Sequence, residues 1–250
     1  MAGVNIAAEQ IETYRRTGHV TMPGVFRPEE MQALATDIEH WGEEFLAGLP
    51  PDKRTWYIDG GVKAREVLRK LDNPHYHRDS VRRIASDPRL TGLVESVIGP
   101  GVKIYFSQVF FKPPEGGGPK SVHQDNFYFG PGDPEGIVTA WVALDDATVE
   151  NGCLYFGEGT HRGPVYKHVA PPGTPYELHV PPDEAARHPM TAAPVPCGGV
   201  SFHHGNVFHQ SGPNHSPRWR RACALHYVTN RNRFVNPALP YDEAVVVRIT

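Results

Sequence analysis

The chain has 250 residues, of which 39% are hydrophobic, and a formal net charge of -3 at pH 7. This length suits a single domain with a buried core, the charge predicts no nucleic-acid partner, and no apolar run is long enough to cross a membrane. The three cysteines are widely spaced and odd in number, and the N-terminus lacks the pattern of a secretory signal, so we expect a cytoplasmic protein without disulfides.

The first hundred residues are predicted to be mainly helical. Apolar side chains recur at helical spacing over residues 6–17, and Gly18 ends that helix. A second helix begins at Pro28, where a proline and two following acids favour a first turn. The predicted elements are helices over 6–17, from 28 onward and over 88–98, a short strand over 19–25, and an irregular stretch over 49–63.

From about residue 102 the pattern changes to short runs rich in β-branched and aromatic residues, separated by turn residues. Such spacing is typical of an all-β sandwich or barrel. The predicted strands are 103–112, 122–129, 137–144, 153–156, 199–203 and 222–229. Residues 163–195 break this rhythm and are too long for an ordinary turn, so they form either a loop over a site or a disordered surface insertion.

His123 and Asp125 are the first candidate metal ligands. They are two residues apart in a predicted strand, so their side chains face the same way. An imidazole and a carboxylate from one strand, joined by a histidine from elsewhere, form a facial triad that leaves three positions on an iron ion. The pair alone is weak evidence, because a His-x-Asp sequence also occurs by chance.

His209 is the candidate third ligand, and Arg220 follows it eleven residues later. A hairpin between them would bring both to one pocket, where the guanidinium can pair with the remote carboxylate of a keto acid. Spacing alone does not exclude the other histidines of this region as ligands. These competitors are His203, His204, His215 and His226.

With these motifs in place, the chain resembles the phytanoyl-CoA dioxygenase family of Fe(II)- and 2-oxoglutarate-dependent oxygenases. The resemblance covers most of the chain and is carried by GHVTMPGVF, FKPPEGG, SVHQD, AWVALDDATVENGCLYFGEGTH and HQSGPN. It implies a mainly β fold with flanking helices, a double-stranded β-helix (jelly-roll, cupin-like). We expect one domain over 1–250, with a helical part over 1–101 packed on a core over 102–250 and a lid loop at 163–195.

The resemblance also implies a role for each matching residue. His123, Asp125 and His209 fall where the family binds iron. Arg220 falls where the family pairs with the far carboxylate of 2-oxoglutarate, and Ser211 matches a hydroxyl that binds the same carboxylate. The further residues expected to line the cosubstrate are Trp141, Lys70 and Gln108.

Strand parity favours Arg220 over Arg221 as the cosubstrate ligand. Arg220 shares a strand face with Ala222 and Ala224, whereas Arg221 shares the other face with bulkier residues such as Leu225. A face of small residues leaves room for a ligand inside a barrel.

We therefore expect an enzyme that uses Fe(II), 2-oxoglutarate and O2 to oxidise a small molecule, in bacterial specialised metabolism. The presence of Asp125 argues against a halogenase, because related halogenases lack this carboxylate and bind halide in its place. Hydroxylation, desaturation, epoxidation and rearrangement stay open. Three alternatives remain: a metal-binding β-barrel without oxygenase activity, a zinc hydrolase using the same ligands, and a purely structural β-sandwich.

Overall fold

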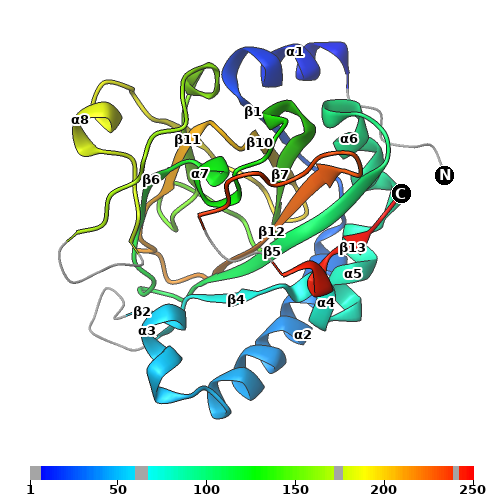
Figure 1. Cartoon of the computed structure of the whole chain (residues 1–250). Coiled ribbons are helices and arrows are strands. Elements are labelled where there is room, and N and C mark those ends of the chain that lie inside the picture. Colours follow the sequence, from blue (N-terminus) through cyan, green and yellow to red (C-terminus); the bar gives the residue numbers. More distant parts are fainter. Residues whose placement is uncertain (1–6, 60–66, 172–176, 239–241) are drawn as a thin grey trace.

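A computed structural model describes residues 7–59, 67–171, 177–238 and 242–250. Part of the predicted irregular stretch, residues 60–63, and part of the predicted lid, residues 172–176, lie outside the described residues. Two β-sheets face each other, and helices cover the outer side of the larger one (Figure 1).

The larger sheet has seven strands in the order β1-β10-β7-β12-β5-β13, with β4 also paired to β5, and all its pairs are antiparallel. Its strands are β1 (His19–Met22), β4 (Lys70–Asp72), β5 (Val102–Lys112), β7 (Ile137–Ala143), β10 (Val200–His204), β12 (Arg220–Thr229) and β13 (Val247–Arg248). Two of these, β1 and β4, come from the part of the chain predicted to be mainly helical.

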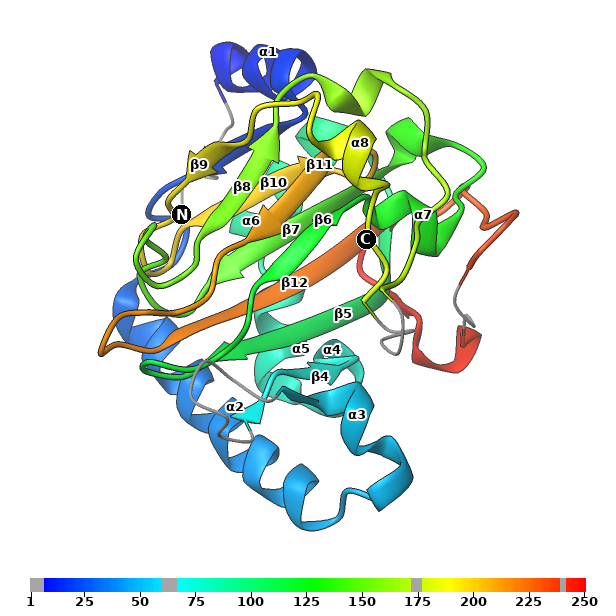
Figure 2. The ribbon, with the colours of Figure 1, turned by 90° about the vertical axis from the view of Figure 1, so that its left-hand side faces the viewer.

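The smaller sheet has the order β6-β11-β8-β9 and lies in front of the larger sheet in Figure 2. Its strands are β6 (Lys120–His123), β8 (Leu154–Gly157), β9 (Thr191–Ala193) and β11 (Phe208–Ser211). A separate pair joins β2 (Ile58–Asp59) to β3 (Val67–Leu68). Two facing antiparallel sheets with flanking helices confirm the predicted jelly-roll fold class.

Helices occur mainly before residue 100, as predicted. They are α1 (Ala8–Thr17), α2 (Pro28–Ala47), α3 (Arg54–Tyr57), α4 (Pro74–His77), α5 (Asp79–Ala85), α6 (Pro88–Ile98), α7 (Asp125–Phe129) and α8 (Pro182–Ala185). Short 3-10 turns lie at Pro51–Lys53, Pro134–Gly136, Thr160–Arg162 and Glu243–Val245. The α1 helix ends as expected at Gly18, whose φ of 88° is the left-handed conformation that glycine adopts without strain.

The main core lies between the helices and the outer face of the larger sheet. Met31, Leu34 and Ile38 of α2 are buried there, at the spacing of one helix face. Alternate residues of β12, such as Leu225 and Tyr227, meet them from the sheet. This packing leaves the opposite face of the larger sheet free to form the interior of the jelly roll.

The predicted strand over 122–129 is wrong beyond His123. β6 ends there, and α7 begins at Asp125 and stops at Gly130, which has a φ of 56°. Gln124 is still extended, with φ -123° and ψ 126°, so the chain turns into the helix at Asp125, the second candidate ligand. The predicted irregular stretch was also incomplete, since its described part holds α3 and β2.

The described parts of the segment 163–195 are ordered and packed. Gln124 is fully buried and bonds to the backbone of this segment: its amide nitrogen donates to the Pro164 carbonyl (3.0 Å), and its oxygen accepts from the Tyr166 N–H (2.9 Å). The Tyr128 hydroxyl donates to the carbonyl of Leu178 (3.0 Å). These bonds attach the described part of the segment to α7. They favour the interpretation of the segment as a loop over a site rather than as a disordered surface insertion.

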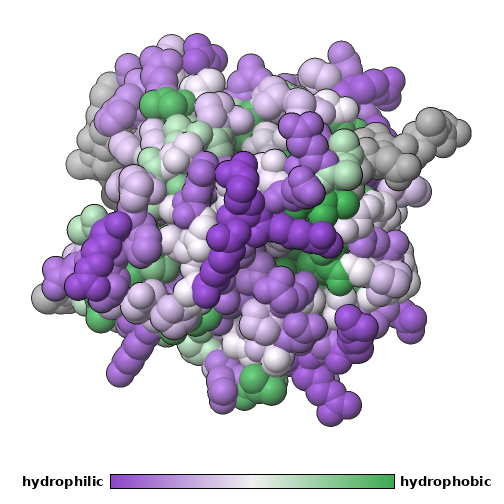
Figure 3. Space-filling model, turned by 90° about the horizontal axis from the view of Figure 1, so that it is seen from above, coloured by the Kyte–Doolittle hydropathy of each residue, from purple (hydrophilic) through white to green (hydrophobic). Residues whose placement is uncertain are grey.

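None of the helices in the described ranges combines the length and apolar character needed to cross a bilayer. The face seen from above is largely hydrophilic, and its apolar side chains form small separate patches (Figure 3).

Candidate active site

Three predicted ligands meet between the two sheets. His209 of β11 stands directly opposite His123 of β6, and Asp125 follows two residues after His123. The Oδ1 atom of Asp125 lies 3.9 Å from Nε2 of His123 and 3.5 Å from Nε2 of His209. The ligand atoms of all three side chains lie within 4.8 Å of one another, so one metal ion can bind to all of them.

Hydrogen bonds orient both imidazole rings for this task. Nδ1 of His123 lies 2.8 Å from the Ser121 carbonyl, and Nδ1 of His209 lies 3.1 Å from the Val207 carbonyl. Because a carbonyl only accepts, each Nδ1 carries the proton and each Nε2 offers its lone pair to the centre. Burial lowers the pKa of His209 to about 4 and that of His123 well below its usual value, so both rings are neutral near pH 7.

Asp125 uses its two oxygens differently. Oδ2 accepts from the Thr139 hydroxyl (2.7 Å) and lies 3.2 Å from Nε2 of His203, which leaves Oδ1 for a metal. Burial alone would raise the pKa of Asp125, but the facing His209 and the bond from His203 outweigh it and hold that pKa well below the usual value. The carboxylate is therefore ionised and fixed in orientation.

The competing histidines have other partners. His203 supports Asp125 and is not part of the convergent group, and Nδ1 of His226 lies 2.8 Å from the Thr139 hydroxyl that bonds Asp125. His204 pairs with Glu135 at 3.2 Å. Thr139 was not predicted, since its role depends on the pairing of β7 with β12, which places it opposite His226.

Arg220 lies on the inner face of β12, as strand parity predicted, and is only 2% exposed. Its guanidinium carbon is 5.5 Å from the ring centre of Trp141, and its Nε has no hydrogen-bond partner among the described residues. Arg221 points the other way and pairs with Asp145 (2.7 Å) and Glu39. Burial lowers the pKa of Arg220 to about 10, so a bound anion would relieve the cost of this buried charge.

Lys112 is a site residue that the sequence analysis missed. It stands directly opposite Arg220 in the β5–β12 pair, and its ammonium donates to the Ser211 hydroxyl (3.0 Å) and to the Gly212 carbonyl. The signal was present, because Lys112 has the same strand parity as the candidate Gln108. Lys112, the neighbour of Arg220 on the larger sheet, therefore contacts a hydroxyl of the smaller sheet.

The predicted hairpin between His209 and Arg220 is wrong. β11 belongs to the smaller sheet and β12 to the larger one. The two residues share a pocket because the sheets face each other, with the contact between Lys112 and Ser211 connecting them.

Lys70 and Gln108 lie on the inner face but are bonded to Asp72. The Lys70 ammonium is 3.1 Å from both carboxylate oxygens, and the Gln108 amide donates to Oδ1 at 2.8 Å. Lys70 also lies 4.4 Å from the ring centre of Trp56. The structure thus places these two predicted residues in a group of their own on β4 and β5.

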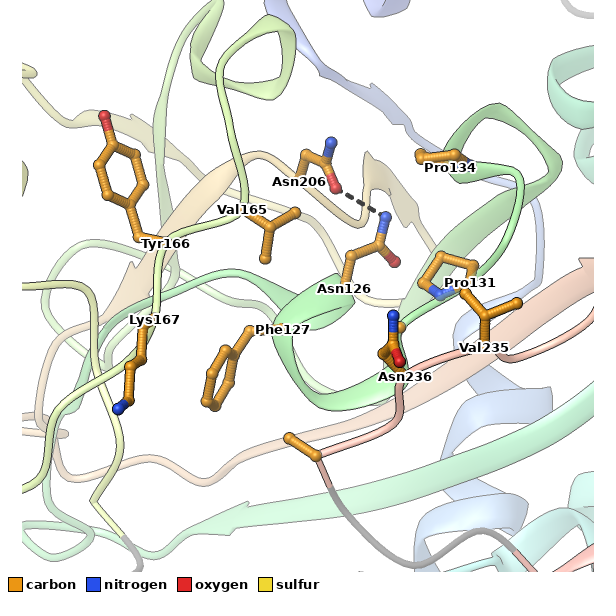
Figure 4. A pocket seen from close by; sticks show the side chains of 12 residues that line it. Asn126, Phe127, Pro131, Pro134, Val165, Tyr166, Lys167, Asn206, Val235 and Asn236 are labelled. Atoms are coloured by element: carbon orange, nitrogen blue, oxygen red, sulfur yellow. Dashed lines mark hydrogen bonds between the residues drawn. The ribbon is translucent and has the colours of Figure 1, made fainter.

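A second pocket of about 400 Å³ lies on the other side of α7, between residues 165–167 and 235–238 (Figure 4). Asn126, the neighbour of Asp125, lines it and donates to the Asn206 side chain at 2.8 Å. The three candidate ligands are not among the residues that line this pocket.

The donor set fits Fe(II), since two neutral imidazoles and one carboxylate on one side of an ion are the ligands of non-haem iron oxygenases. The guanidinium of Arg220, whose Nε lacks a partner in the described part of the chain, and the ammonium of Lys112 fit the far carboxylate of a dicarboxylic keto acid.

Comparisons with known proteins agree with this chemistry. The chain is 28% identical over 231 residues to the probable alpha-ketoglutarate-dependent hypophosphite dioxygenase of Stutzerimonas stutzeri, covering 88% of this chain and 78% of that protein. It is 34% identical to phytanoyl-CoA dioxygenase domain-containing protein 1 of Bos taurus, covering 89% and 90%.

Solved structures share the fold. The non-heme alpha ketoglutarate dependent carbocyclase SnoK from nogalamycin biosynthesis has a TM-score of 0.77 at 20% identity, with complete coverage of both chains. The epimerase SnoN, solved with Fe3+, alpha ketoglutarate and nogalamycin RO, has a TM-score of 0.71 at 25% identity over 92% of this chain and 86% of that one. The family model described as phytanoyl-CoA dioxygenase (PhyH) matches residues 14–222, and the chain therefore belongs to this family of non-haem Fe(II)- and 2-oxoglutarate-dependent dioxygenases.

Proposed function

We propose that the protein oxidises a small organic molecule with Fe(II), 2-oxoglutarate and O2, and that His123, Asp125 and His209 hold the iron. The observation that carries this proposal is the convergence of two Nε2 atoms and one carboxylate oxygen in a buried site. A zinc hydrolase would use the same three ligands, but it has no need for the buried guanidinium of Arg220, whose Nε has no partner among the described residues.

In this proposal, Arg220, Lys112 and Ser211 bind the far carboxylate of 2-oxoglutarate, and Trp141 forms a wall beside it. The Ser211 hydroxyl accepts from Lys112, so its own proton remains available to the carboxylate. Gln108 and Lys70 of the same inner face remain the further residues proposed to line the cosubstrate, and Asp72 holds both side chains in place.

When bound, iron and 2-oxoglutarate supply the activation of O2 and the oxidation of the substrate, with release of succinate and CO2. The chain orients the metal ligands and controls the access of water to the site. The Ser121 and Val207 carbonyls fix the two rings, and Thr139 with His203 turns Oδ1 of Asp125 toward the metal. The segment 163–195, attached to α7 through its described residues, covers the site and limits the entry of water.

We also propose a metabolic setting and a compartment for this activity. The relatives named above include enzymes of hypophosphite and nogalamycin chemistry, which supports a small-molecule substrate and a place in bacterial specialised metabolism. Three free cysteines, Cys153, Cys197 and Cys223, support a reducing, cytoplasmic compartment.

The proposal predicts that Asp125→Ala abolishes 2-oxoglutarate turnover. The variant loses the one anionic ligand, so succinate formation with Fe(II) and O2 should fall by at least ~100-fold. The measurement is succinate release in the presence of a panel of candidate metabolites.

Asp52→Ala, which removes an exposed carboxylate, is the control and should keep its activity. Full turnover by Asp125→Ala would show that the ligand assignment is wrong.

A further inference from the structure

The pocket beside α7 is built from three separate segments of the chain (Figure 4). One wall is α7 with the turn that follows it, the second is the segment 165–167, and the third is the segment 235–238. The volume of about 400 Å³ falls within the range of roughly 300–1,000 Å³ that is usual for sites of small organic ligands. The space is therefore large enough for part of a substrate molecule.

Hydrogen bonds hold the three walls in place. The Val235 N–H donates to the Gly130 carbonyl at 2.8 Å, which joins the segment 235–238 to the end of α7. Gly130 permits this close approach, because a Cβ at this position would collide with the carbonyl oxygen of Asn236. On the other side, the side-chain oxygen of Gln124 accepts from the Tyr166 N–H at 2.9 Å. The pocket is therefore formed before a ligand arrives.

The lining of the pocket is mostly apolar, and its apolar members are Phe127, Pro131, Pro134, Val165, Val235 and Ala238. Val165 and Val235 are 40% and 62% exposed, and a ligand that covers this apolar surface gains free energy. Lys167 is the one charged residue among the described residues of the lining, and it is exposed. Water screens a charge at such a position. The lining therefore favours an uncharged ligand.

Three asparagines supply most of the polar part of the lining. Asn126 and Asn206 are buried, and the Asn126 amide donates to the Asn206 carboxamide oxygen at 2.8 Å. Asn236 is exposed on the wall formed by the segment 235–238. A carboxamide carries no charge and both donates and accepts hydrogen bonds. Such groups suit a hydroxyl or a carbonyl of a neutral ligand.

Phe127 connects the pocket with the metal site. Its ring lines the pocket, and the centre of this ring is 5.3 Å from the ring centre of Tyr128. The ring centre of Tyr128 is in turn 6.2 Å from that of the candidate ligand His123. His168 stacks on Phe127 at 4.0 Å and nearly parallel, which fixes the orientation of the Phe127 ring. Two aromatic rings therefore lie between the pocket and an iron ligand, and a molecule with several rings spans that distance.

We infer that the pocket beside α7 binds an uncharged, largely apolar ring of the substrate, while the carbon to be oxidised lies at the metal. This inference rests on the proposed function. The flat side chains of Phe127 and Pro131 pack well against a ring, and a rigid ring loses little conformational entropy when it binds. The substrate class is therefore a neutral molecule that carries a ring with hydroxyl or carbonyl groups.

Two fluorescent probes that differ by one charge test this ligand class. N-phenyl-1-naphthylamine is uncharged, and 8-anilinonaphthalene-1-sulfonate is the same molecule with an added sulfonate. Protein loaded with Fe(II) and saturated with 2-oxoglutarate, without oxygen, is titrated with each probe. The uncharged probe should bind at least ~10-fold more tightly than the sulfonate. Val235→Asp should weaken the binding of the uncharged probe ~10-fold or more, because the variant places a charge in an apolar lining.

Val149→Asp is the matched control, since Val149 is 57% exposed and is not among the residues that line the pocket. This variant should bind the uncharged probe like the wild type, and both variants should keep the wild-type affinity for 2-oxoglutarate. Equal or tighter binding of the sulfonate by the wild type would overturn the inference. So would equal binding of the uncharged probe by Val235→Asp and the wild type.

The role of the pocket in substrate binding is tested with a metabolite that supports succinate formation. The metabolite should displace the uncharged probe, and Val235→Asp should raise its apparent KM ~10-fold with kcat unchanged. A metabolite that is oxidised while the probe stays bound would remove the pocket from the substrate site. If the wild type does not bind 2-oxoglutarate, the proposed function fails, while the two probe titrations still decide whether the pocket takes a neutral ligand.

Discussion

The two oxygens of Asp125 have different surroundings, and Oδ1 is the one proposed to bind the metal. Oδ2 is held by Thr139 and His203, and Oδ1 faces the two imidazoles. Such supporting bonds fix a ligand before the metal arrives and so reduce the entropy that binding costs. Strand parity predicted that His123 and Asp125 share a side, but their supports lie on other strands and could not be found from spacing.

Arg220→Ala should mainly raise the 2-oxoglutarate requirement. The buried guanidinium is unpaired among the described residues, and a charge-assisted bond to a carboxylate is worth about 1.5–3 kcal/mol. We expect the apparent KM for 2-oxoglutarate to rise ~10-fold or more, measured by succinate formation.

Arg218→Ala is the matched control, since the Arg218 side chain is exposed and forms an ion pair with the exposed Glu150. An unchanged 2-oxoglutarate requirement in Arg220→Ala would remove this residue from the cosubstrate site.

A site residue could be predicted where its position along one strand was enough to place its side chain, and not where its role depends on the pairing of two strands. Arg220 could be selected because its neighbours on the same face are alanines. Strand parity puts Lys112 on the same face as Gln108, but its place directly opposite Arg220 follows only from the register that sets β5 against β12. For Lys70 and Gln108 the inner position was predicted, but their bonds to Asp72 needed the pairing of β4 with β5.

Among the elements, α7 and the segment 163–195 act as one unit through Gln124. This side chain is fully buried and bonds to the Pro164 carbonyl, the Asn206 carbonyl and the Tyr166 N–H. The N–H of Gln124 in turn donates to Nε2 of His168 at 3.0 Å. The residue between two metal ligands therefore also anchors the proposed cover.

Gln124→Ala should destabilise the protein and loosen the cover. Three buried backbone groups lose their partners, so the free energy of unfolding should fall by about 2–3 kcal/mol. Urea denaturation measures this change, and limited proteolysis should show faster cleavage within residues 163–171.

Gln32→Ala, on the exposed side of α2, should change neither quantity. If Gln124→Ala has the stability and protease resistance of the wild type, the segment is not held through this side chain.

Long periodic elements were predictable and short ones were not. The helix α6 has a capping aspartate, a proline in its first turn and an apolar stripe, and its predicted span of 88–98 is confirmed. The prediction of a strand over 122–129 was wrong after His123, because the five aromatic or polar residues that follow Gln124 form a single helical turn, which ends at Gly130. Periodicity cannot separate a run this short from a strand.

In the whole molecule, the two faces of the larger sheet have different roles. The outer face packs against helices and stabilises the fold, and the inner face carries the polar groups of the site. The jelly roll was predictable from the number of strands and from the family resemblance. The sheet order was not, because it depends on pairings between distant strands.

Acid should destabilise the fold through buried histidines such as His75. Its Nε2 donates to the Val245 carbonyl (2.7 Å), its Nδ1 lies 2.6 Å from the Ser107 hydroxyl, and burial lowers its pKa to about 4. The unfolded chain, with a pKa of about 6.5, binds a proton that the folded state does not, so stability rises with pH between 4 and 6.5 and is lost as pH falls.

His75 should contribute about 2 kcal/mol or less to the loss of stability between pH 7 and pH 5. Denaturation at both values should show a smaller difference for His75→Gln than for the wild type, with His40→Gln at an exposed position as the control. The same pH dependence in His75→Gln and in the wild type would contradict this assignment.

The claim that His123, Asp125 and His209 hold Fe(II) for 2-oxoglutarate is tested most directly by visible absorption without oxygen. Addition of 2-oxoglutarate to the Fe(II)-loaded protein should produce a weak charge-transfer band, because the keto acid chelates an ion that can donate an electron to it, as zinc with its filled d shell cannot. The account predicts this band in the wild type and its loss in Asp125→Ala. An unchanged spectrum in the wild type, or an equal band in Asp125→Ala, would contradict it.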